Sequence, residues 1–210
     1  MSVKLIDHMG TDLSVVNAAR VSFAKENKEF QVVDDSRLIR YLAKHNHWSP
    51  FGHASLQFHV TAPVFVARQL VKHQVGLVWN EVSRRYVDSE PEFHFVEEWR
   101  GSPDNKKQGS SDEVIDISTH IQEDYTNMCT YTYRYLLDKG VCPEQARMVL
   151  PQSMMTEWYW SGTLMAFARV CNLRCKEDAQ KETQDIAYSI DSLCRTQFPV
   201  SWNALRNMPT

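Results

Sequence analysis

The 210-residue sequence contains no run of apolar residues long enough to cross a membrane. The stretch from Met1 to Asp7 also lacks the apolar core of a secretory signal. These two absences lead us to expect a cytoplasmic location and no membrane partner.

The sequence also lacks a marked excess of one charge. Its 23 Lys and Arg residues and 26 Asp and Glu residues give a net charge of −3, so we expect no general attraction for a nucleic-acid polymer. Any phosphate recognition must then come from a local site. The length, with 43% hydrophobic and 23% charged residues, is typical of one globular domain spanning residues 1–210.

Cysteines are few and are not paired in the sequence. The five are Cys129, Cys142, Cys171, Cys175 and Cys194. Their odd number and the lack of a Cys-x-x-Cys spacing argue against a disulfide framework. Cys171 and Cys175 lie one helical turn apart and are compatible with a shared metal ion, but a zinc site needs four ligands and no second pair is near. We expect no metal and reduced thiols that pack inside the protein, Cys142 among them.

Hydrophobic spacing predicts strands and helices in mixed order. The expected strands cover 3–6, 56–60, 93–96 and 153–161. The expected helices cover 12–24, 34–45, a segment that begins at Pro63 and breaks after Gln74, 110–139 with Gly140 as its C′ residue, 162–171 and 177–194. Residues 100–111 are typical of a surface loop, and Trp202 and Leu205 are expected to dock the C-terminal tail. We expect an α+β fold, with a central, mostly antiparallel sheet flanked by helices.

A polar cluster follows the helix that begins at Pro63. Residues 80–86 combine an amide, a carboxylate, a hydroxyl and two guanidinium groups, with too little apolar content to belong to a core. Such a cluster offers hydrogen-bond donors of several geometries to one anionic ligand. A solvated loop with surface ion pairs is the alternative interpretation.

This cluster resembles half of the signature of flavin-dependent thymidylate synthases, which reads Arg-His-Arg, a short spacer, then Asn-Glu-x-Ser-x-Arg-Tyr. The second half is matched at every fixed position by Asn80-Glu81-Val82-Ser83-Arg84-Arg85-Tyr86. The first half departs from the family, because Lys72-His73-Gln74 stands where Arg-His-Arg is expected and the spacer is one residue longer.

Three further segments resemble the same family in the same order along the chain. Residues 47–53 resemble His-x-Ser/Thr-Pro-Phe-Glu-His, with Gly52 in place of the glutamate. Residues 144–151 resemble Glu-x-Ala-Arg-x-x-Leu-Pro, and residues 172–174 resemble the Asn-x-x-Leu-Arg helix terminus. Thr163 and Arg169 stand where asparagines that touch flavin are common in the family.

The resemblance implies reductive methylation of dUMP to dTMP. In this reaction 5,10-methylenetetrahydrofolate gives the carbon, NADPH gives the reducing equivalents and FAD carries hydride between them, since no side chain can do so. It further implies a homotetramer with shared active sites and a place in the cytoplasm of a bacterium, or of the host cell if a phage encodes the chain. Six Trp, eight Tyr and nine Phe also favour association.

The resemblance assigns roles to individual residues. Those that hold dUMP are Gln69, Lys72, Glu81, Ser83, Arg84 through its backbone, Arg85, Arg147 and Arg174. Those that hold FAD are Ser49, His53, Lys72, His73, Gln74, Glu81, Thr163 and Arg169. Arg174 is also the catalytic residue, because a cation beside the N3/O2 edge of uracil favours an enolate-like ring and makes C5 nucleophilic without a covalent cysteine.

Two alternatives stay open at this point. A histidine-rich metal hydrolase is compatible with His45, His47, His53 and His59. A nucleotide- or flavin-binding module without turnover is compatible with the departures at residues 72, 74, 163 and 169. Arg147 also has a plainer interpretation as an exposed arginine on a short helix, although a buried guanidinium would need an anionic partner.

Overall fold

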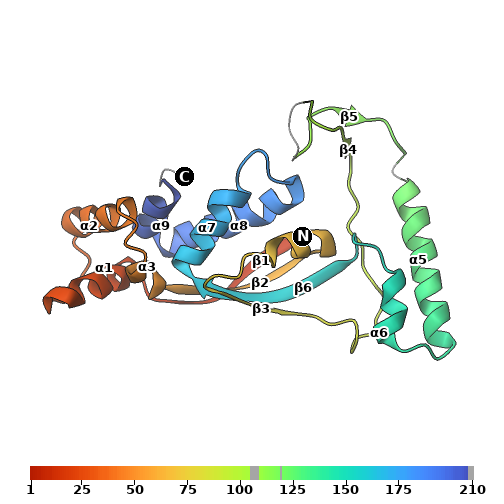
Figure 1. The fold of residues 1–210 in the computed structure, drawn as a ribbon, viewed down its shortest axis with the longest axis horizontal. Helices are drawn as coiled ribbons and strands as arrows, with labels where there is room; N and C mark the ends of the chain where they lie inside the picture. The colour runs from red at the N-terminus through yellow and green to blue at the C-terminus, as the bar shows by residue number, and fades with distance from the viewer. Residues whose placement is uncertain (105–108, 119, 208–210) are drawn as a thin grey trace.

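A four-stranded antiparallel sheet forms the middle of the protein. The computed structural model describes residues 1–104, 109–118 and 120–207 (Figure 1). The strands follow the order β1-β2-β6-β3, and their bounds are Ser2–Met9, Ser55–Pro63, Met155–Thr163 and Leu77–Glu81. This sheet and the helices around it confirm the expected α+β class.

Alternation along β2 and β6 explains why these residues form the two central strands. Leu56, Phe58 and Val60 of β2 are buried, whereas the residues between them are half-buried on the opposite face. Trp158 and Trp160 of β6 point to the same buried side and lie beside the β2 core residues in register. One face of the sheet is therefore the floor of the core.

Helices cover that floor from one side (Figure 1). They are α4 (Val64–Leu70), α7 (Leu164–Arg174), α8 (Lys181–Gln197) and α9 (Pro199–Arg206). α7 lies deepest, and Phe167 packs edge-on against Phe58 with ring centroids 4.9 Å apart. Trp202 and Leu205 of α9 are fully buried, which confirms that the tail docks on the body.

The remaining elements extend the molecule at both ends of the sheet (Figure 1). One end carries α1 (Asp12–Arg20), a 3₁₀ turn (Val21–Phe23), α2 (Val32–Lys44) and α3 (Ser49–Gly52). The other end carries β4 (Trp99–Arg100), β5 (Val114–Ile115), α5 (His120–Asp138), α6 (Pro143–Ala146) and a 3₁₀ turn (Arg147–Val149). No described helix is both long and apolar enough to span a membrane.

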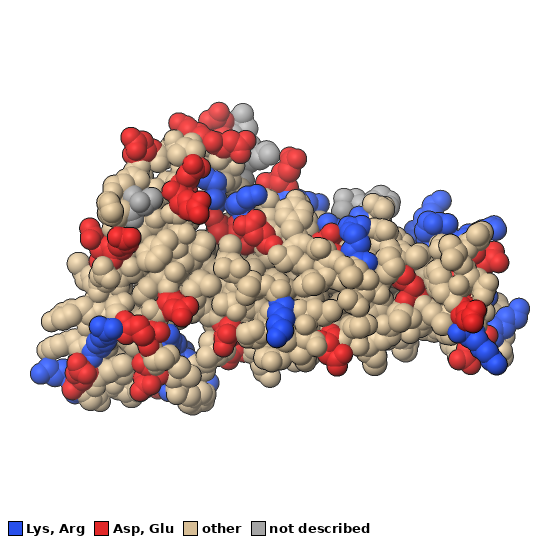
Figure 2. All heavy atoms as spheres, turned by 180° about the vertical axis from the view of Figure 1, so that it is seen from behind, with Lys and Arg blue, Asp and Glu red and all other residues tan. Residues whose placement is uncertain are grey.

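Charged side chains do not form one large field on the face seen from behind. Figure 2 shows Lys and Arg scattered over this face, while Asp and Glu gather at the end that holds the β4–β5 hairpin. This distribution agrees with the small net charge of −3. It offers no basic track for a nucleic-acid polymer on the face shown.

Two expected elements beyond residue 90 are wrong. The strand expected at 93–96 is reduced to one bridge between Phe93 and Met154. The helix expected from residue 110 begins only at His120, because 114–115 pair instead with 99–100 as a hairpin. Pairing between these two short segments therefore replaces the first turns of the expected helix, and spacing along the chain does not reveal such pairing. Residues 105–108 of the expected loop lie outside the described residues.

Strand β3 was missed, and the start of α2 was misplaced. Gly76 adopts φ +76°, which reverses the chain, and Gly162 lies so close to it that an added Cβ would meet the Gly76 carbonyl oxygen at 2.5 Å. The chain can therefore enter β3 as an edge strand despite its polar content. α2 begins at Val32, since the buried Asp35 carboxylate accepts the N–H of Gln31 from inside the helix.

The cysteines are mostly as expected. Cys129, Cys171 and Cys194 are buried, and Cys175 is half-buried. Cys142, however, is exposed just before α6, so the expectation that it packs in the interior is wrong. Pro143 starts α6 directly after it, and that turn directs the preceding side chain outward.

Candidate active site

The residues assigned from the sequence fall into three groups on the single chain. The strand-end group contains His53, Gln74 and Thr163. The helix group contains Gln69, His73 and Arg174. The cavity group contains Glu81, Arg84 and Arg147.

The strand-end group is assembled where β2 begins, β6 ends and β3 begins. Thr163 pairs with Ser55 across the sheet, and its N–H donates to the Gly76 carbonyl at 3.1 Å. The Thr163 hydroxyl accepts the N–H of Ala166 at 3.2 Å and so caps α7. The Thr163 hydroxyl therefore caps the helix, as threonine hydroxyls at N-cap positions commonly do.

Several other residues assigned to FAD border this end of the sheet. Ser49 and His53 flank α3 and are exposed, directly before β2. Lys72 and Gln74 are exposed in the turn that leads to Gly76, and Arg169 is the exposed position of an otherwise buried α7 segment. The fold thus gathers exposed polar side chains from three distant segments at one edge.

The helix group centres on one hydrogen bond between the ends of α4 and α7. The Arg174 guanidinium donates through Nε to Nε2 of His73 at 3.0 Å. Gln69, one turn earlier on α4, donates through Nε2 to Gln180 at 3.4 Å. The Gln69 Oε1 atom is buried and has no hydrogen-bond partner among the described residues. A hydrogen-bond donor from a ligand would satisfy this buried acceptor and so be stabilising.

Burial and charge together keep His73 neutral. Burial lowers the pKa of His73, and the positive charge of Arg174 lowers it further. Burial also lowers the pKa of Arg174, but an arginine starts so far above neutrality that it remains charged. The neutral imidazole can therefore accept the guanidinium hydrogen and fix the orientation of Arg174.

The lowered pKa of His73 predicts a pH-dependent loss of stability. The unfolded chain takes up a proton near the ordinary histidine pKa of about 6.5, whereas the folded chain resists it. The stability that the neutral His73 contributes is therefore fully present above the ordinary pKa. It is lost as the pH falls from there through the lowered pKa of the folded chain. We expect the free energy of unfolding of the wild type, relative to His73→Gln, to decrease between about pH 7.5 and pH 5 in urea titrations. Parallel pH curves for the two proteins would contradict this.

The cavity group lies at the opposite end of β3 from the strand-end group. A cavity of about 610 Å³ is lined by residues that include Arg68, Glu81, Arg84 and Arg147. The Glu81 carboxylate is held in place, since Oε1 accepts from the Thr156 hydroxyl at 2.8 Å. Its Oε2 accepts from the indole N–H of Trp79 at 3.1 Å. The cavity therefore presents one oriented carboxylate and three arginines.

The arginines of this region differ in how they are held. Arg84 donates to the backbone carbonyls of Ser89 and Glu90 and so braces its own loop. Arg147 is exposed, and its only hydrogen bond to a described residue goes to the Glu144 carbonyl at 3.3 Å. The interpretation of Arg147 as a buried charge that needs an anionic partner therefore does not hold for the single chain. Arg147 keeps most of its donors available to a ligand.

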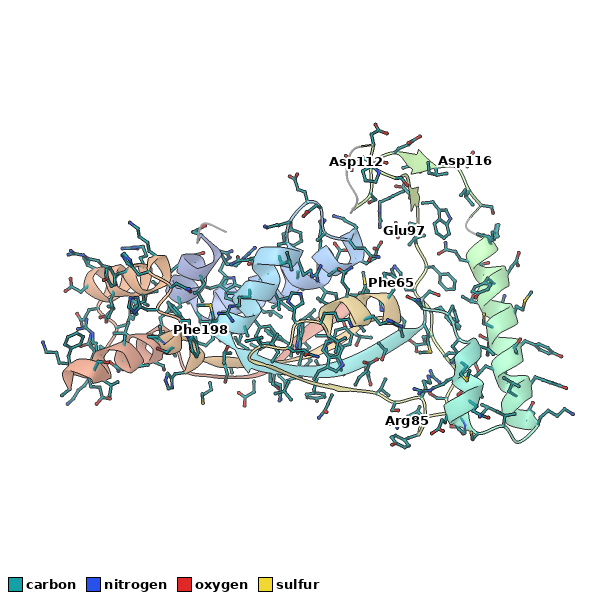
Figure 3. All side chains as sticks on the ribbon, in the orientation of Figure 1. Phe65, Arg85, Glu97, Asp112, Asp116 and Phe198 are labelled. Atoms are coloured by element: carbon teal, nitrogen blue, oxygen red, sulfur yellow. The ribbon has the colours of Figure 1, made fainter. Side chains whose placement is uncertain are left out.

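Ser83 and Arg85 continue the polar cluster beyond the cavity. The Arg85 Nε donates to the Ser83 hydroxyl at 3.2 Å, and its guanidinium lies 5.0 Å from the ring centre of Tyr86. Figure 3 shows Arg85 on the loop after β3, below α6 and well away from α7. The Ser83 hydroxyl and the Arg85 guanidinium therefore lie side by side, and both can donate hydrogen bonds to one ligand.

Arg68 is a site residue that the sequence reasoning missed. It is exposed on α4 and lines the cavity, although its neighbour Gln69 turns toward the helix group. The sequence could have indicated it, because Arg68 directly precedes the assigned Gln69. Neighbouring residues of a helix point in different directions, so α4 can present one of these side chains to each of two groups. α4 therefore serves both groups.

The single chain does not bring all assigned residues together. Within the described residues, no hydrogen bond joins Arg174 to Arg147 or Arg85, and the cavity that Arg147 lines is not lined by Arg174. The helix group lies with α7 on the covered side of the sheet, whereas the cavity group lies toward α6 (Figures 1 and 3). The helix group and the cavity group therefore lie at two separate places on the single chain.

The histidines of the hydrolase alternative are dispersed. His59 faces Glu157 at 3.3 Å on the sheet, whereas His45 and His47 lie near Tyr41 beside α2. Of the residues described, only Cys171, Cys175 and Asp191 form a set of three potential metal ligands. The geometry therefore does not support the hydrolase.

Comparison with known proteins relates most of the chain to one family. Residues 4–200 match the family described as "Thymidylate synthase complementing protein". A flavin-dependent thymidylate synthase from Thermus thermophilus is 38% identical over 207 residues, which are 96% of this chain and 74% of that protein. One from Kosmotoga olearia is 36% identical over 209 residues, 98% and 90% of the two chains.

A solved structure supports the same relationship. The UMP/dUMP methylase PolB from Streptomyces cacaoi, bound with 5-Br dUMP, aligns with a TM-score of 0.84 and 29% identity, over 99% of this chain and 95% of that one. The sequence and the fold therefore point to the same family. The chain belongs to the flavin-dependent thymidylate synthase family.

Proposed function

We propose that this protein methylates dUMP to dTMP reductively and that Arg174 activates the uracil ring. The carbon comes from 5,10-methylenetetrahydrofolate and the reducing equivalents from NADPH, as in the family to which the chain belongs. The observation that carries the proposal is the Arg174–His73 hydrogen bond of 3.0 Å, which holds a half-buried guanidinium at the end of α7.

A guanidinium in this position has a definite chemical effect. Placed beside the N3/O2 edge of uracil, it stabilises negative charge that develops on the ring and so favours the enolate-like form in which C5 is nucleophilic. Because His73 is neutral, it orients Arg174 without adding a second positive charge. The unpartnered Gln69 Oε1 offers an acceptor to the same nucleotide. No covalent cysteine is needed for this activation.

The phosphate and sugar of dUMP are assigned to the other end of β3. Ser83, Arg85 and the Arg84 backbone supply donors, and Arg147 supplies a second guanidinium with free hydrogen-bonding capacity. A planar guanidinium matches the phosphate oxygens with two parallel bonds. Glu81 is oriented by Thr156 to accept from the ribose or from the cofactor. Lys72 lies at the strand end of the single chain, so its point charge reaches this nucleotide from another copy. PolB, whose fold is similar, binds 5-Br dUMP.

The residues at the strand end suit a flavin dinucleotide in their donor chemistry. Lys72, His73, Arg169 and His53 offer cationic or N–H donors for phosphate and ring atoms, and Gln74 offers an amide. Gln74 lacks the charge of the family arginine, so Lys72 is the cation that remains in that tripeptide. When bound, FAD supplies the hydride transfer that side chains cannot perform.

The separation of the three groups supports a homotetramer with shared active sites. α5 also leaves an apolar stripe exposed, at a spacing that follows one helix face. Its members are Ile121, Tyr125, Met128, Tyr131 and Tyr135. An unpartnered aromatic stripe of this kind is stabilised by burial against another copy of the chain. We place the assembly in the cytoplasm of a bacterium or of a phage host, where its nucleotide and folate substrates are soluble.

The proposed activity is tested by tritium release from [5-³H]dUMP. The purified protein, supplied with FAD, NADPH and 5,10-methylenetetrahydrofolate, should release tritium to water and form dTMP in equal amounts. Omitting any one component should abolish both. A protein that binds dUMP yet releases no tritium and oxidises no NADPH would instead be the binding module without turnover.

The exposed Cys142 should not be required for catalysis. It precedes α6 in the neighbourhood of Arg147, so it is the thiol best placed to be mistaken for a nucleophile. We expect Cys142→Ser to retain turnover within about twofold of the wild type, because an exposed side chain far from a packed core is replaced at little cost. Turnover and dUMP affinity are the measurements. A total loss in a folded Cys142→Ser variant would point to covalent catalysis.

A further inference from the structure

A pair of cysteines lies at the C-terminal end of α7, one residue from Arg174. The Cys171 and Cys175 sulfurs and one Asp191 carboxylate oxygen all lie within 4.8 Å of one another. Cys171 is buried, and Cys175 is half-buried as the last capping residue of the helix. The Cys175 N–H donates to the Cys171 carbonyl at 3.0 Å, so the two residues share one turn.

Asp191 is already fully engaged, which argues against a metal ion here. Its Oδ1 accepts from Trp202 Nε1 at 3.0 Å and from Arg206 Nε at 2.5 Å. Its Oδ2 accepts from Arg195 at 3.0 Å. A cation bound at this oxygen would lie against two guanidinium groups, which would repel it. The two thiols are therefore better suited to react with each other than to bind a metal ion.

The two thiols are unequal. The neighbouring Cys171 thiol lowers the pKa of Cys175, and the charge of Arg206 lowers it further, although burial opposes both. Burial raises the pKa of Cys171, whose thiol donates to the Ala187 carbonyl at 3.5 Å. The Asp191 carboxylate also opposes the lowering of the Cys175 pKa. A partly exposed thiol with a lowered pKa that lies beside a buried second thiol is the arrangement of a reactive and a resolving cysteine.

We propose that Cys175 and Cys171 form a reversible disulfide when a hydroperoxide reaches Cys175. The Cys175 thiolate attacks the terminal peroxide oxygen, the O–O bond breaks, and the leaving oxygen takes a proton to become an alcohol or water. The resulting sulfenic acid is attacked by the Cys171 sulfur, which loses its proton as the S–O bond breaks and water leaves. The two cysteines lose two electrons and two protons, which the peroxide accepts.

The disulfide would act on the active site through the backbone of α7. A bond of about 2 Å requires the sulfurs to approach each other, and Cys175 must move because Cys171 is fixed in the core. Arg174 precedes Cys175 and would be displaced from His73. A misplacement of about 1 Å lowers turnover by about a hundredfold. This consequence rests on the proposed role of Arg174, whereas formation of the disulfide does not.

Peptide mapping tests the disulfide directly on the full-length protein. Trypsin cleaves after Arg169, Arg174 and Lys176, so it separates the two cysteines into the peptides 170–174 and 175–176. After treatment with hydrogen peroxide and alkylation, the two peptides should be recovered joined, and dithiothreitol should separate them. Cys175→Ser should give no joined peptides, whereas Cys142→Ser, which removes an exposed thiol elsewhere, should behave as the wild type. Absence of joined peptides from the oxidised wild type would overturn the proposal.

Turnover separates the two parts of the inference. Oxidised wild type should lose about a hundredfold in dTMP formation and recover it in dithiothreitol, whereas peroxide-treated Cys175→Ser should keep its turnover. If the joined peptides form and turnover is unchanged, the regulatory consequence is wrong. If the protein forms the joined peptides and has no activity in any state, the proposed function fails and the disulfide stands.

Discussion

Arg174→Ala is expected to reduce dTMP formation by about a hundredfold to a thousandfold, the usual cost of removing one donor that stabilises developing negative charge. The half-buried guanidinium is held at 3.0 Å by a neutral imidazole and is the cation that we assign to uracil. Because the effect lies in the transition state, kcat should fall more than dUMP affinity. Tritium release from [5-³H]dUMP measures the chemical step.

Two further variants make the interpretation of Arg174→Ala specific. Arg174→Lys keeps the positive charge but loses the planar fork and the bond to His73, so its activity should lie between those of the wild type and Arg174→Ala. Arg37→Ala removes an exposed arginine of α2 that belongs to none of the three groups, and it should leave turnover unchanged. Near wild-type tritium release by a folded Arg174→Ala variant would refute the role.

Co-expression of Arg174→Ala and Arg147→Ala chains is expected to give a kcat/KM higher than that of either variant alone. Arg147→Ala should lower kcat/KM for dUMP by about tenfold, since a charge-assisted hydrogen bond is lost. If one site takes Arg174 from one copy and Arg147 from another, random mixing makes about a quarter of the sites intact. Kcat/KM per site should then be about a quarter of the wild-type value.

The opposite result is equally defined. If each copy carried both arginines of its own site, mixing would give the mean of the two single variants, about a twentieth of the wild-type kcat/KM. Separate tags on the two chains allow mixed assemblies to be isolated before assay. Arg37→Ala co-expressed with Arg174→Ala provides the matched control. Every chain in this mixture carries Arg147, so kcat/KM per site should be about half of the wild-type value, the fraction of sites that receive an intact Arg174.

The central strands were predictable because their side chains obey a simple alternation. Phe58 and Val60 of β2 face the core, and Trp158 and Trp160 of β6 extend the same face, so period-two burial was visible in the sequence. β3 was not, because Asn80 and Glu81 lie at its polar end on an edge of the sheet. The apolar part of β3 is only three residues long, Leu77 to Trp79, and so short a run does not identify a strand without its pairing to β6.

The sequence indicated which residues belong to the site better than it indicated how they are arranged. The motifs named Arg85, Arg147 and Arg174, yet nothing in the spacing showed that Arg174 is oriented by His73 or that Arg147 is exposed. Contacts between residues more than 100 positions apart depend on how α4 and α7 cross, which local patterns do not encode. Cys142 was assigned to the interior for the same reason, because its exposure follows from where α6 begins.

The most direct test of the account is an experimental structure of the assembly with dUMP and FAD bound. We expect Arg174 of one copy to contact the uracil ring, and Arg85 and Arg147 to contact the phosphate of the same nucleotide, each within about 4 Å. Arg85, Arg147 and Arg174 found on separate solvent-facing surfaces, with no nucleotide between them in any pair of copies, would contradict the account.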